Sequence, residues 1–308
     1  MKKQNVSRRQ FIGTGLLAAA GMALASKSSF ANSFFTKVKP NSKINGVQIG
    51  VITYSFRSMP GTIQQILQYC IECDINDIEL MGEAAEAYAG APKYDNSADY
   101  STRLAAWRES TLMDPFIEIR KMYNDAGVNI YAWKPNALNA KNTDGEITYA
   151  FNAGKALGCT HVTVELPDEL QTQRLGDLAE KSSMMVGYHA HTQATPTLWD
   201  AALSQNDHNG INLDIGHYVA GTNTSPIDFI MKNHKRILSM HLKDRKFHDG
   251  PNMPWGQGDT PIKEVLALMK KEGYKFPATI EQEYKIPDGS DAVKEVIKCR
   301  EYAKAALS

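Results

Sequence analysis

The sequence has no excess of charge of either sign, because 34 Lys and Arg residues balance 34 Asp and Glu residues. This balance argues against partners that are held by bulk positive charge, such as nucleic acid or an anionic membrane. Hydrophobic residues make up 43% of the 308 residues and charged residues 22%. That composition provides enough apolar material for a sizeable core, so we expect a folded domain.

The chain has only four cysteines, which are Cys70, Cys73, Cys159 and Cys299. Cys70 and Cys73 have the CxxC spacing, but no second pair is present to complete a structural zinc site. Both lie within a helical apolar pattern, so we interpret them as small buried hydrophobic residues. A disulfide between them stays open at this point.

No apolar run is long enough for a comfortable membrane span, and the longest, Gly13 to Ala25, is rich in Gly and Ala. It follows the twin-arginine pattern Ser7-Arg8-Arg9-Gln10-Phe11-Ile12 and precedes Ser29-Phe30-Ala31, a small-residue cleavage pattern. We therefore expect residues 1–31 to be a twin-arginine signal peptide. Residues 32–308 would form the mature, periplasmic domain, which has no membrane segment.

The mature chain alternates short β-rich runs with amphipathic helical stretches, which predicts parallel strands joined by helical crossovers. The first strand is not followed by a Gly-rich turn, since Ile52-Thr53-Tyr54-Ser55 stands there. This argues against a doubly wound nucleotide-binding sheet, and eight strands are the number that closes a barrel. We predict a single α/β domain, a (β/α)₈ TIM barrel. The expected strands are Val47–Phe56, Asp77–Leu80, Val128–Pro135, His161–Pro167, Met185–Thr192, Ile211–His217, Ile237–Asp244 and Ala278–Glu283.

Ionisable residues stand where several of these apolar runs end, and the carboxyl ends of barrel strands carry active sites. Burying each residue unpaired would cost several kcal/mol, a cost that a shared cation removes. Three carboxylates and one imidazole form a hard, octahedral ligand set that favours manganese, magnesium or cobalt over zinc. The predicted metal ligands are Glu165, Asp214, His241 and Glu281, with Glu283 as the alternative to Glu281.

Four of these strands resemble the xylose-isomerase-like barrel superfamily, which includes tagatose 3-epimerase, hydroxypyruvate isomerase, inosose dehydratase and endonuclease IV. The resemblance covers essentially the whole mature chain. In the family, an Asp-x-x-His strand supplies a metal ligand and a substrate contact, and a His-Leu-Lys-Asp strand and a final Glu supply further ligands. The matching segments are Leu213-Asp214-Ile215-Gly216-His217, Met240-His241-Leu242-Lys243-Asp244, Ala278-Thr279-Ile280-Glu281 and the histidine-rich Tyr188-His189-Ala190-His191-Thr192. The dehydratase branch draws a Glu ligand from the fourth strand, as Glu165 would, whereas the epimerase branch draws it from the fifth, where this chain has histidines.

The resemblance and the polar strand ends together predict a divalent-metal-dependent isomerase or epimerase of an unphosphorylated keto-sugar, acting through an enediolate. A 3-keto-glycoside lyase or dehydratase using the same site is the alternative reaction. The candidate catalytic residues are His189, His191, Glu281, His217 and Lys243. The candidate substrate contacts are Tyr54, Glu79, Trp133, His217, Arg245 and Trp255, the last as a ring that stacks on the sugar from a lid.

Two further classes remain open. A nuclease like endonuclease IV needs three zinc ions and more ligands than this chain offers, and the neutral charge argues against it. A sugar-binding barrel without turnover would need only part of the ligand set. The sequence does not decide whether the protein forms a homo-oligomer.

Overall fold

The computed structural model describes residues 39–308. Residues 1–38 are outside the described residues, so the predicted signal peptide at 1–31 and its cleavage stay predictions.

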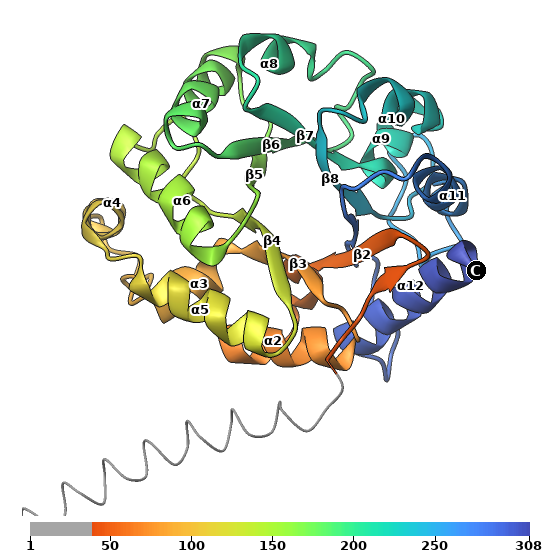
Figure 1. Ribbon diagram of the computed structural model, residues 1–308, viewed down its shortest axis with the longest axis horizontal. Helices are drawn as coiled ribbons and strands as arrows, with labels where there is room; N and C mark the ends of the chain where they lie inside the picture. The colour runs from red at the N-terminus through yellow and green to blue at the C-terminus, as the bar shows by residue number, and fades with distance from the viewer. Residues whose placement is uncertain (1–38) are drawn as a thin grey trace, which may run out of the picture. The chain divides into compact units, whose positions relative to one another are not determined.

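Eight parallel strands, β2 to β9, form a barrel that is closed by pairing of β2 with β9 (Figure 1). Helices follow the strands and surround them, which confirms the predicted (β/α)₈ TIM barrel. The short strand β1 (Lys43–Ile44) pairs antiparallel with β2 ahead of the barrel. The barrel strands are β2 (Val47–Ile52), β3 (Asp77–Met81), β4 (Asn129–Lys134), β5 (His161–Glu165), β6 (Met185–His189), β7 (Asn209–Asp214), β8 (Ile237–Leu242) and β9 (Ala278–Ile280).

Several helices begin where the sequence supplies a capping residue. Thr62 and Thr143 each accept a backbone N–H and start a reciprocal capping box with Gln65 and Glu146. Among residues 39–308, no helix is both long and apolar enough to cross a bilayer. The helices are η1 (Thr53–Phe56), α2 (Ile63–Glu72), α3 (Gly82–Tyr88), α4 (Tyr100–Ser110), α5 (Asp114–Asp125), α6 (Asp144–Leu157), α7 (Glu169–Lys181), α8 (Asp200–Gln205), α9 (Ile215–Thr222), α10 (Ile227–Asn233), α11 (Ile262–Glu272) and α12 (Ala292–Leu307).

Most predicted strands run past the observed strand ends, and the first, expected at Val47–Phe56, ends at Ile52, where the 3₁₀ helix η1 begins. The expected strand Ile211–His217 ends at Asp214, because the Asp214 side chain caps α9 and turns the chain into a helix there. The expected strand Ala278–Glu283 ends as a strand at Ile280, so Glu281 and Glu283 lie on a loop. The segment between the expected strands Asp77–Leu80 and Val128–Pro135 contains three helices, α3, α4 and α5.

A β-bulge in β4 decides which of its side chains face the barrel interior. Ile130 pairs with Ile78 and Ala132 pairs with Glu79, so Tyr131 is an extra residue between them. Such an insertion shifts the alternation of side chains by one position. Downstream of it, Trp133 faces outward and packs on Phe116 of α5 and Tyr149 of α6.

A buried ion cluster fixes α4 to its neighbours. The Arg108 guanidinium contacts Glu86 of α3 at 2.9 Å and Glu146 of α6 at 3.0 Å, and all three residues are buried. Removing one partner would leave a buried charge uncompensated, which is strongly destabilising.

The four cysteines are free and buried, as the interpretation of Cys70 and Cys73 as small buried residues expects. Burial raises the pKa of Cys70 to about 12, so its thiol stays protonated at neutral pH.

Candidate metal centre

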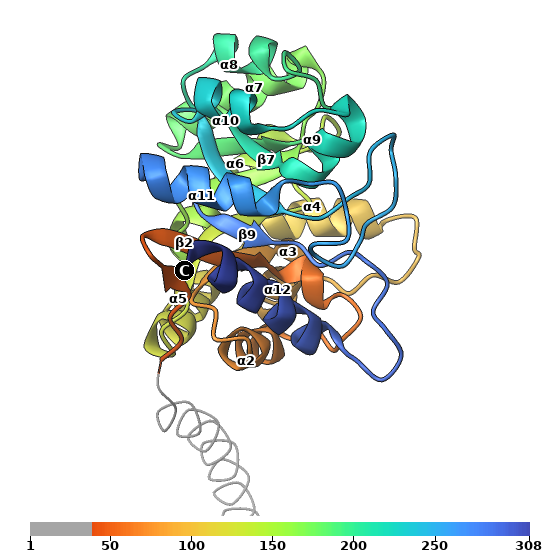
Figure 2. The same ribbon diagram turned by 90° about the vertical axis from the view of Figure 1, so that its right-hand side faces the viewer.

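Four potential ligand atoms converge at the carboxyl end of the barrel, one each from His189, Asp214, His241 and Glu281. All lie within 4.8 Å of one another, and all four residues are buried. They come from the ends of four successive strands, β6, β7, β8 and β9, or the residue just after. Figure 2 shows the long loops that follow β8 and β9 extending from the same side of the barrel.

Three atoms of this group, Asp214 Oδ2, His241 Nδ1 and Glu281 Oε2, are fully buried, and charged groups are their only polar contacts. Asp214 Oδ2 and Glu281 Oε2 each lie 3.1 Å from Nζ of Lys243, and Nδ1 of His241 lies 2.9 Å from Oε2 of Glu281. Buried charges are normally paired or bind metal ions. Two carboxylates and two imidazoles are ligands that transition metals accept. The cluster can therefore bind a metal ion.

His241 lies between two carboxylates. Its Nε2 is 2.7 Å from Oε2 of Glu79, and its Nδ1 faces Glu281. Burial opposes the charged imidazole, but the two carboxylates prevail and raise the pKa of His241 to about 10. The site thus places negative charge on both sides of the His241 ring, as is expected of a site that binds a cation.

Asp214 serves the fold and the site with different oxygens. Its Oδ1 accepts the backbone N–H of His217 at 2.7 Å and caps α9. Its Oδ2 faces the cluster. Capping and metal binding are therefore compatible roles for this one carboxylate.

Lys243 brings a cation to the edge of the cluster. Its Nζ lies 3.1 Å from both Asp214 Oδ2 and Glu281 Oε2, and 2.5 Å from Oε2 of Glu283. Burial opposes the charge, but the three carboxylates raise the pKa of Lys243 above its usual range. The side chain is therefore an ammonium donor and not a base at neutral pH.

Glu165, the fourth expected ligand, is not part of the converging group. Its side chain is half-exposed, and Lys134 donates to its Oε1 at 2.7 Å. Lys134 is not recognisable as a site residue from the sequence, because only the bulge at Tyr131 brings its side chain to the interior face. His189, the register partner of Glu165 on β6, takes the fourth position.

Three imidazoles form a second, overlapping group at the same rim, with ligand atoms of His189, His191 and His217 within 4.8 Å of one another. Burial lowers the pKa of His189 to about 3, and burial together with the Lys243 ammonium lowers the pKa of His217 to about 2. Both rings are therefore neutral at physiological pH. The more exposed His191 places Nε2 3.5 Å from Oε2 of Glu165.

The predicted substrate contacts are spread over different environments. Tyr54 is exposed at the rim, and Arg245 donates to Nδ1 of His217 at 2.7 Å. Glu79 is completely buried and paired with His241, so its contacts are internal. Trp133 faces the helical layer, as described above. Trp255 packs on Tyr302 of α12, with ring centroids 5.8 Å apart.

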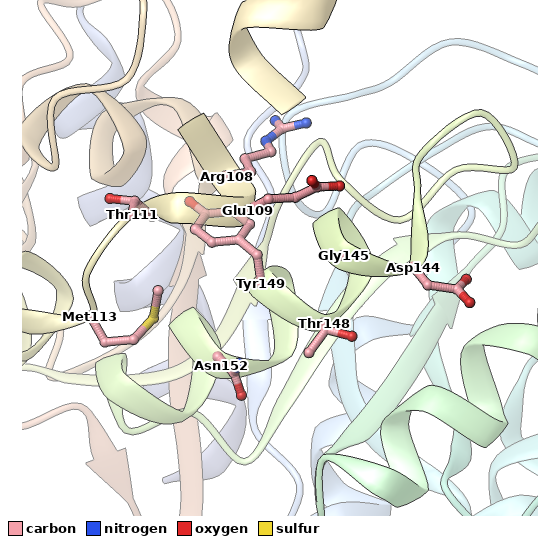
Figure 3. Close-up of a pocket in the computed structure, with 9 residues that line it drawn as sticks. All are labelled: Arg108, Glu109, Thr111, Met113, Asp144, Gly145, Thr148, Tyr149 and Asn152. Carbon is pink, nitrogen blue, oxygen red and sulfur yellow. The ribbon is translucent and has the colours of Figure 1, made fainter. Parts of the chain in front are cut away.

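A separate pocket of about 470 Å³ lies between α4 and α6 (Figure 3). None of the candidate catalytic, metal or substrate residues lines it. Its lining residues are Arg108, Glu109, Thr111, Met113, Asp144, Gly145, Thr148, Tyr149 and Asn152.

Solved structures with the same fold have low sequence identity to this chain. A sugar phosphate isomerase/epimerase from Parabacteroides distasonis matches at TM-score 0.59 and 18% identity, covering 85% of this chain and 95% of that one. The IolI protein with a bound zinc atom matches at TM-score 0.60 and 15% identity, covering 85% of this chain and 98% of that one. The 3-keto-D-glucoside 4-epimerase from E. coli matches at TM-score 0.59 and 13% identity, covering 83% of this chain and 99% of that one.

At these identities the likeness establishes the fold alone. No curated protein matches the sequence. The family model described as "Xylose isomerase-like TIM barrel" matches residues 83–302, which is most of the chain. The protein belongs to the xylose isomerase-like TIM barrel family.

Proposed function

We propose that this protein is a divalent-metal-dependent enzyme that removes the proton beside the carbonyl of an unphosphorylated keto-sugar and returns it, as an isomerase or epimerase does. The observation that carries the proposal is the convergence of buried ligand atoms from His189, Asp214, His241 and Glu281 within 4.8 Å of one another at the carboxyl end of the barrel. The name of one structural neighbour, a 3-keto-D-glucoside 4-epimerase, supports a keto-sugar substrate, whereas another is named a sugar phosphate isomerase/epimerase.

The residues that would hold the ion are His189, Asp214, His241 and Glu281. This set replaces Glu165 by an imidazole, which shifts the preference from magnesium toward manganese, cobalt or zinc. When bound, such an ion supplies Lewis-acid stabilisation of the negative charge that develops on the sugar oxygens.

His191 is the residue best placed to move the proton. It lies at the open rim beside His189 and His217, with ring centroids 5.2 and 4.7 Å away. Glu165 lies within reach of its Nε2, and Lys134 holds Glu165 in turn. A base held in place by a carboxylate is a common arrangement for proton transfer. The Lys243 ammonium would stabilise charge on a substrate oxygen.

The basic side chains of this region support an unphosphorylated substrate, because each already has acceptors. Lys134 pairs with Glu165, and Lys243 with three carboxylates. Arg245 donates to the Gly250 carbonyl at 2.6 Å, and Arg57 to the Gln282 carbonyl at 2.8 Å. A phosphate would have to break one of these pairs.

The test is solvent exchange. Wild-type protein, loaded with Mn²⁺ and incubated with keto-sugars in deuterated water, should place deuterium beside the carbonyl. His241→Ala should lose both metal and exchange, whereas His191→Ala should keep the metal and slow exchange by roughly 10²- to 10⁴-fold. His208→Ala is the matched control, because His208 precedes β7 at the opposite end of the barrel.

The outcomes distinguish the competing reactions. Loss of a β-oxygen substituent after proton removal would identify the 3-keto-glycoside lyase or dehydratase. A filled metal site without exchange or elimination on any keto-sugar would contradict the enzyme proposal and favour a sugar-binding barrel. Equal metal content in wild type and His241→Ala would contradict the metal site.

A further inference from the structure

Beneath the metal centre, the barrel interior holds a hydrogen-bonded network built around the carboxylate of Glu79. Barrel interiors are usually filled by branched apolar side chains, so a fully buried glutamate there needs strong compensation. Four donors surround it. They are Thr163 Oγ1 at 2.5 Å, His241 Nε2 at 2.7 Å, Asn212 Nδ2 at 3.1 Å and Tyr131 OH at 3.4 Å.

This arrangement fixes the orientation of the Asn212 side chain. An ionised carboxylate can only accept hydrogen bonds, so Asn212 must direct its NH₂ group toward Glu79. The same NH₂ group lies 2.9 Å from Ser239 Oγ. The carbonyl oxygen of the Asn212 amide is thereby directed to the other side, toward His189.

The orientation of Asn212 determines in turn which nitrogen of His189 carries a hydrogen. Nδ1 of His189 lies 3.0 Å from Oδ1 of Asn212, which can only accept. Nδ1 must therefore donate, and Nε2 keeps its lone pair for the site. His241 is oriented in the opposite sense, because its Nε2 is directed to Glu79 and its Nδ1 to Glu281.

We propose that Glu79 and Asn212 act as a positioning pair that selects the ring nitrogen presented to the metal centre by each of two histidines, Nε2 of His189 and Nδ1 of His241. Both residues of the pair are completely buried, so we expect neither to contact the substrate. The significance for metal binding rests on the proposed function, whereas the tautomer of His189 follows from the donors and acceptors alone. For His241, the contact with Glu79 fixes the orientation of the ring.

Histidine side-chain ¹H–¹⁵N correlation spectra of the metal-free protein test the selection directly. In the wild type, His189 should give the pattern of a neutral ring protonated at Nδ1. Asn212→Ala removes the acceptor and should produce a mixture of both tautomers or the Nε2-protonated form. His241 keeps its 2.7 Å contact with Glu79 and loses only the 3.4 Å contact between its Nε2 and Nδ2 of Asn212, so the His241 signals should change less.

Metal titration provides the second measurement. Glu79→Gln replaces an acceptor by an amide that can also donate, so the directions of the network are no longer fixed. We expect Mn²⁺ or Zn²⁺ affinity to fall about 10- to 100-fold, as is typical when an outer partner of a metal-ligating histidine is removed. The matched control is Glu86→Gln, another buried carboxylate, whose side-chain partners are Arg108 and Tyr149 and none of the four converging residues. It should lower stability but leave metal affinity and His189 tautomer unchanged.

Unchanged tautomer in Asn212→Ala, or unchanged metal affinity in a folded Glu79→Gln protein, would overturn the proposal. If Glu79→Gln does not fold, the Asn212→Ala spectrum decides. A wild-type protein that binds neither metal would contradict the proposed function, while the tautomer of His189 would still test the positioning pair.

Discussion

Lys243 and Glu283 form an ion pair in which Nζ lies 2.5 Å from Oε2 of the carboxylate. Lys243 also lies 3.1 Å from Oε2 of Glu281, but Glu281, unlike Glu283, belongs to the four converging residues and places Oε2 2.9 Å from Nδ1 of His241. The sequence left these two glutamates as alternative ligands, since they are two residues apart. The structure gives the two carboxylates different surroundings, so the effects of substituting each one can be compared directly.

Glu281→Gln should weaken metal affinity by more than the roughly 10- to 100-fold expected for an outer residue, because it removes a charged ligand. Glu283→Gln should keep the metal, since it removes only a partner of Lys243. Titration of both variants with Mn²⁺ would measure the difference. Equal losses in the two variants would contradict the assignment.

Glu165→Gln should keep its metal and lose activity. In the structure, Glu165 contacts Lys134 and His191 and not the four converging atoms. The expected effect is therefore on kcat, through a less well-oriented His191. Elemental analysis and single-turnover kinetics would separate the two roles. Loss of metal in this variant would return Glu165 to the ligand set that the sequence suggested.

The metal-free protein should be most stable near pH 6.5. Burial lowers the pKa values of His161, His189 and His217 to about 4, 3 and 2. Below pH 6.5 the unfolded chain therefore binds more protons than the folded state, and the free energy of unfolding decreases as the pH is lowered. Each contributes up to about 1.4 kcal/mol per pH unit. Asp77 offsets part of this loss below pH 6, because burial raises its pKa to about 6.

Above pH 6.5 the sign reverses. Burial opposes the charge, but Glu79 and Glu281 raise the pKa of His241 to about 10, so the folded state holds a proton that the unfolded chain releases near pH 6.5. This stabilisation is complete below pH 6.5 and disappears as the pH rises toward 10. Urea unfolding in the presence of a chelator, from pH 5 to pH 9, would measure both slopes. A maximum at pH 8 or above would contradict these shifts.

Export is a separate prediction, which rests on the sequence of residues 1–31. Replacing Arg8 and Arg9 by Lys should leave the precursor in the cytoplasm, because the twin-arginine route depends on that pair. Cell fractionation and the N-terminal sequence of the exported protein would measure route and cleavage site. Normal export of the double variant would contradict the route.

The barrel could be predicted from the sequence because each strand and helix has its own hydrophobic period. Strand β3 was expected within one residue of its observed bounds, and Asp214, His241 and Glu281 lie together at one end of the barrel, as the sequence predicts. The grouping of Glu165 with them differs from the structure. The position of a residue at a strand end predicts that it lies at the rim of the barrel. The direction of its side chain depends on neighbouring side chains, and Lys134 binds the Glu165 carboxylate away from the other three residues.

Glu79 shows a second limit. From the sequence it was a polar residue in an early strand and was assigned to the substrate. Its actual partners, Thr163, Asn212 and His241, are 84, 133 and 162 residues away in the chain. Residues so far apart in the sequence come into contact only when the barrel closes, so no local sequence pattern predicts these contacts.

The extra residue at Tyr131 has a consequence for the comparison of related sequences. A homologue that lacks one residue in this strand would turn the counterpart of Trp133 into the lumen and move the counterpart of Lys134 out among the helices. The two alignment columns of Trp133 and Lys134 would then exchange the helical layer and the lumen, although the register of every other strand stayed the same. Alignments of distant members therefore need a single-residue gap here, and the identity of the lysine column is meaningful only among chains that share the insertion.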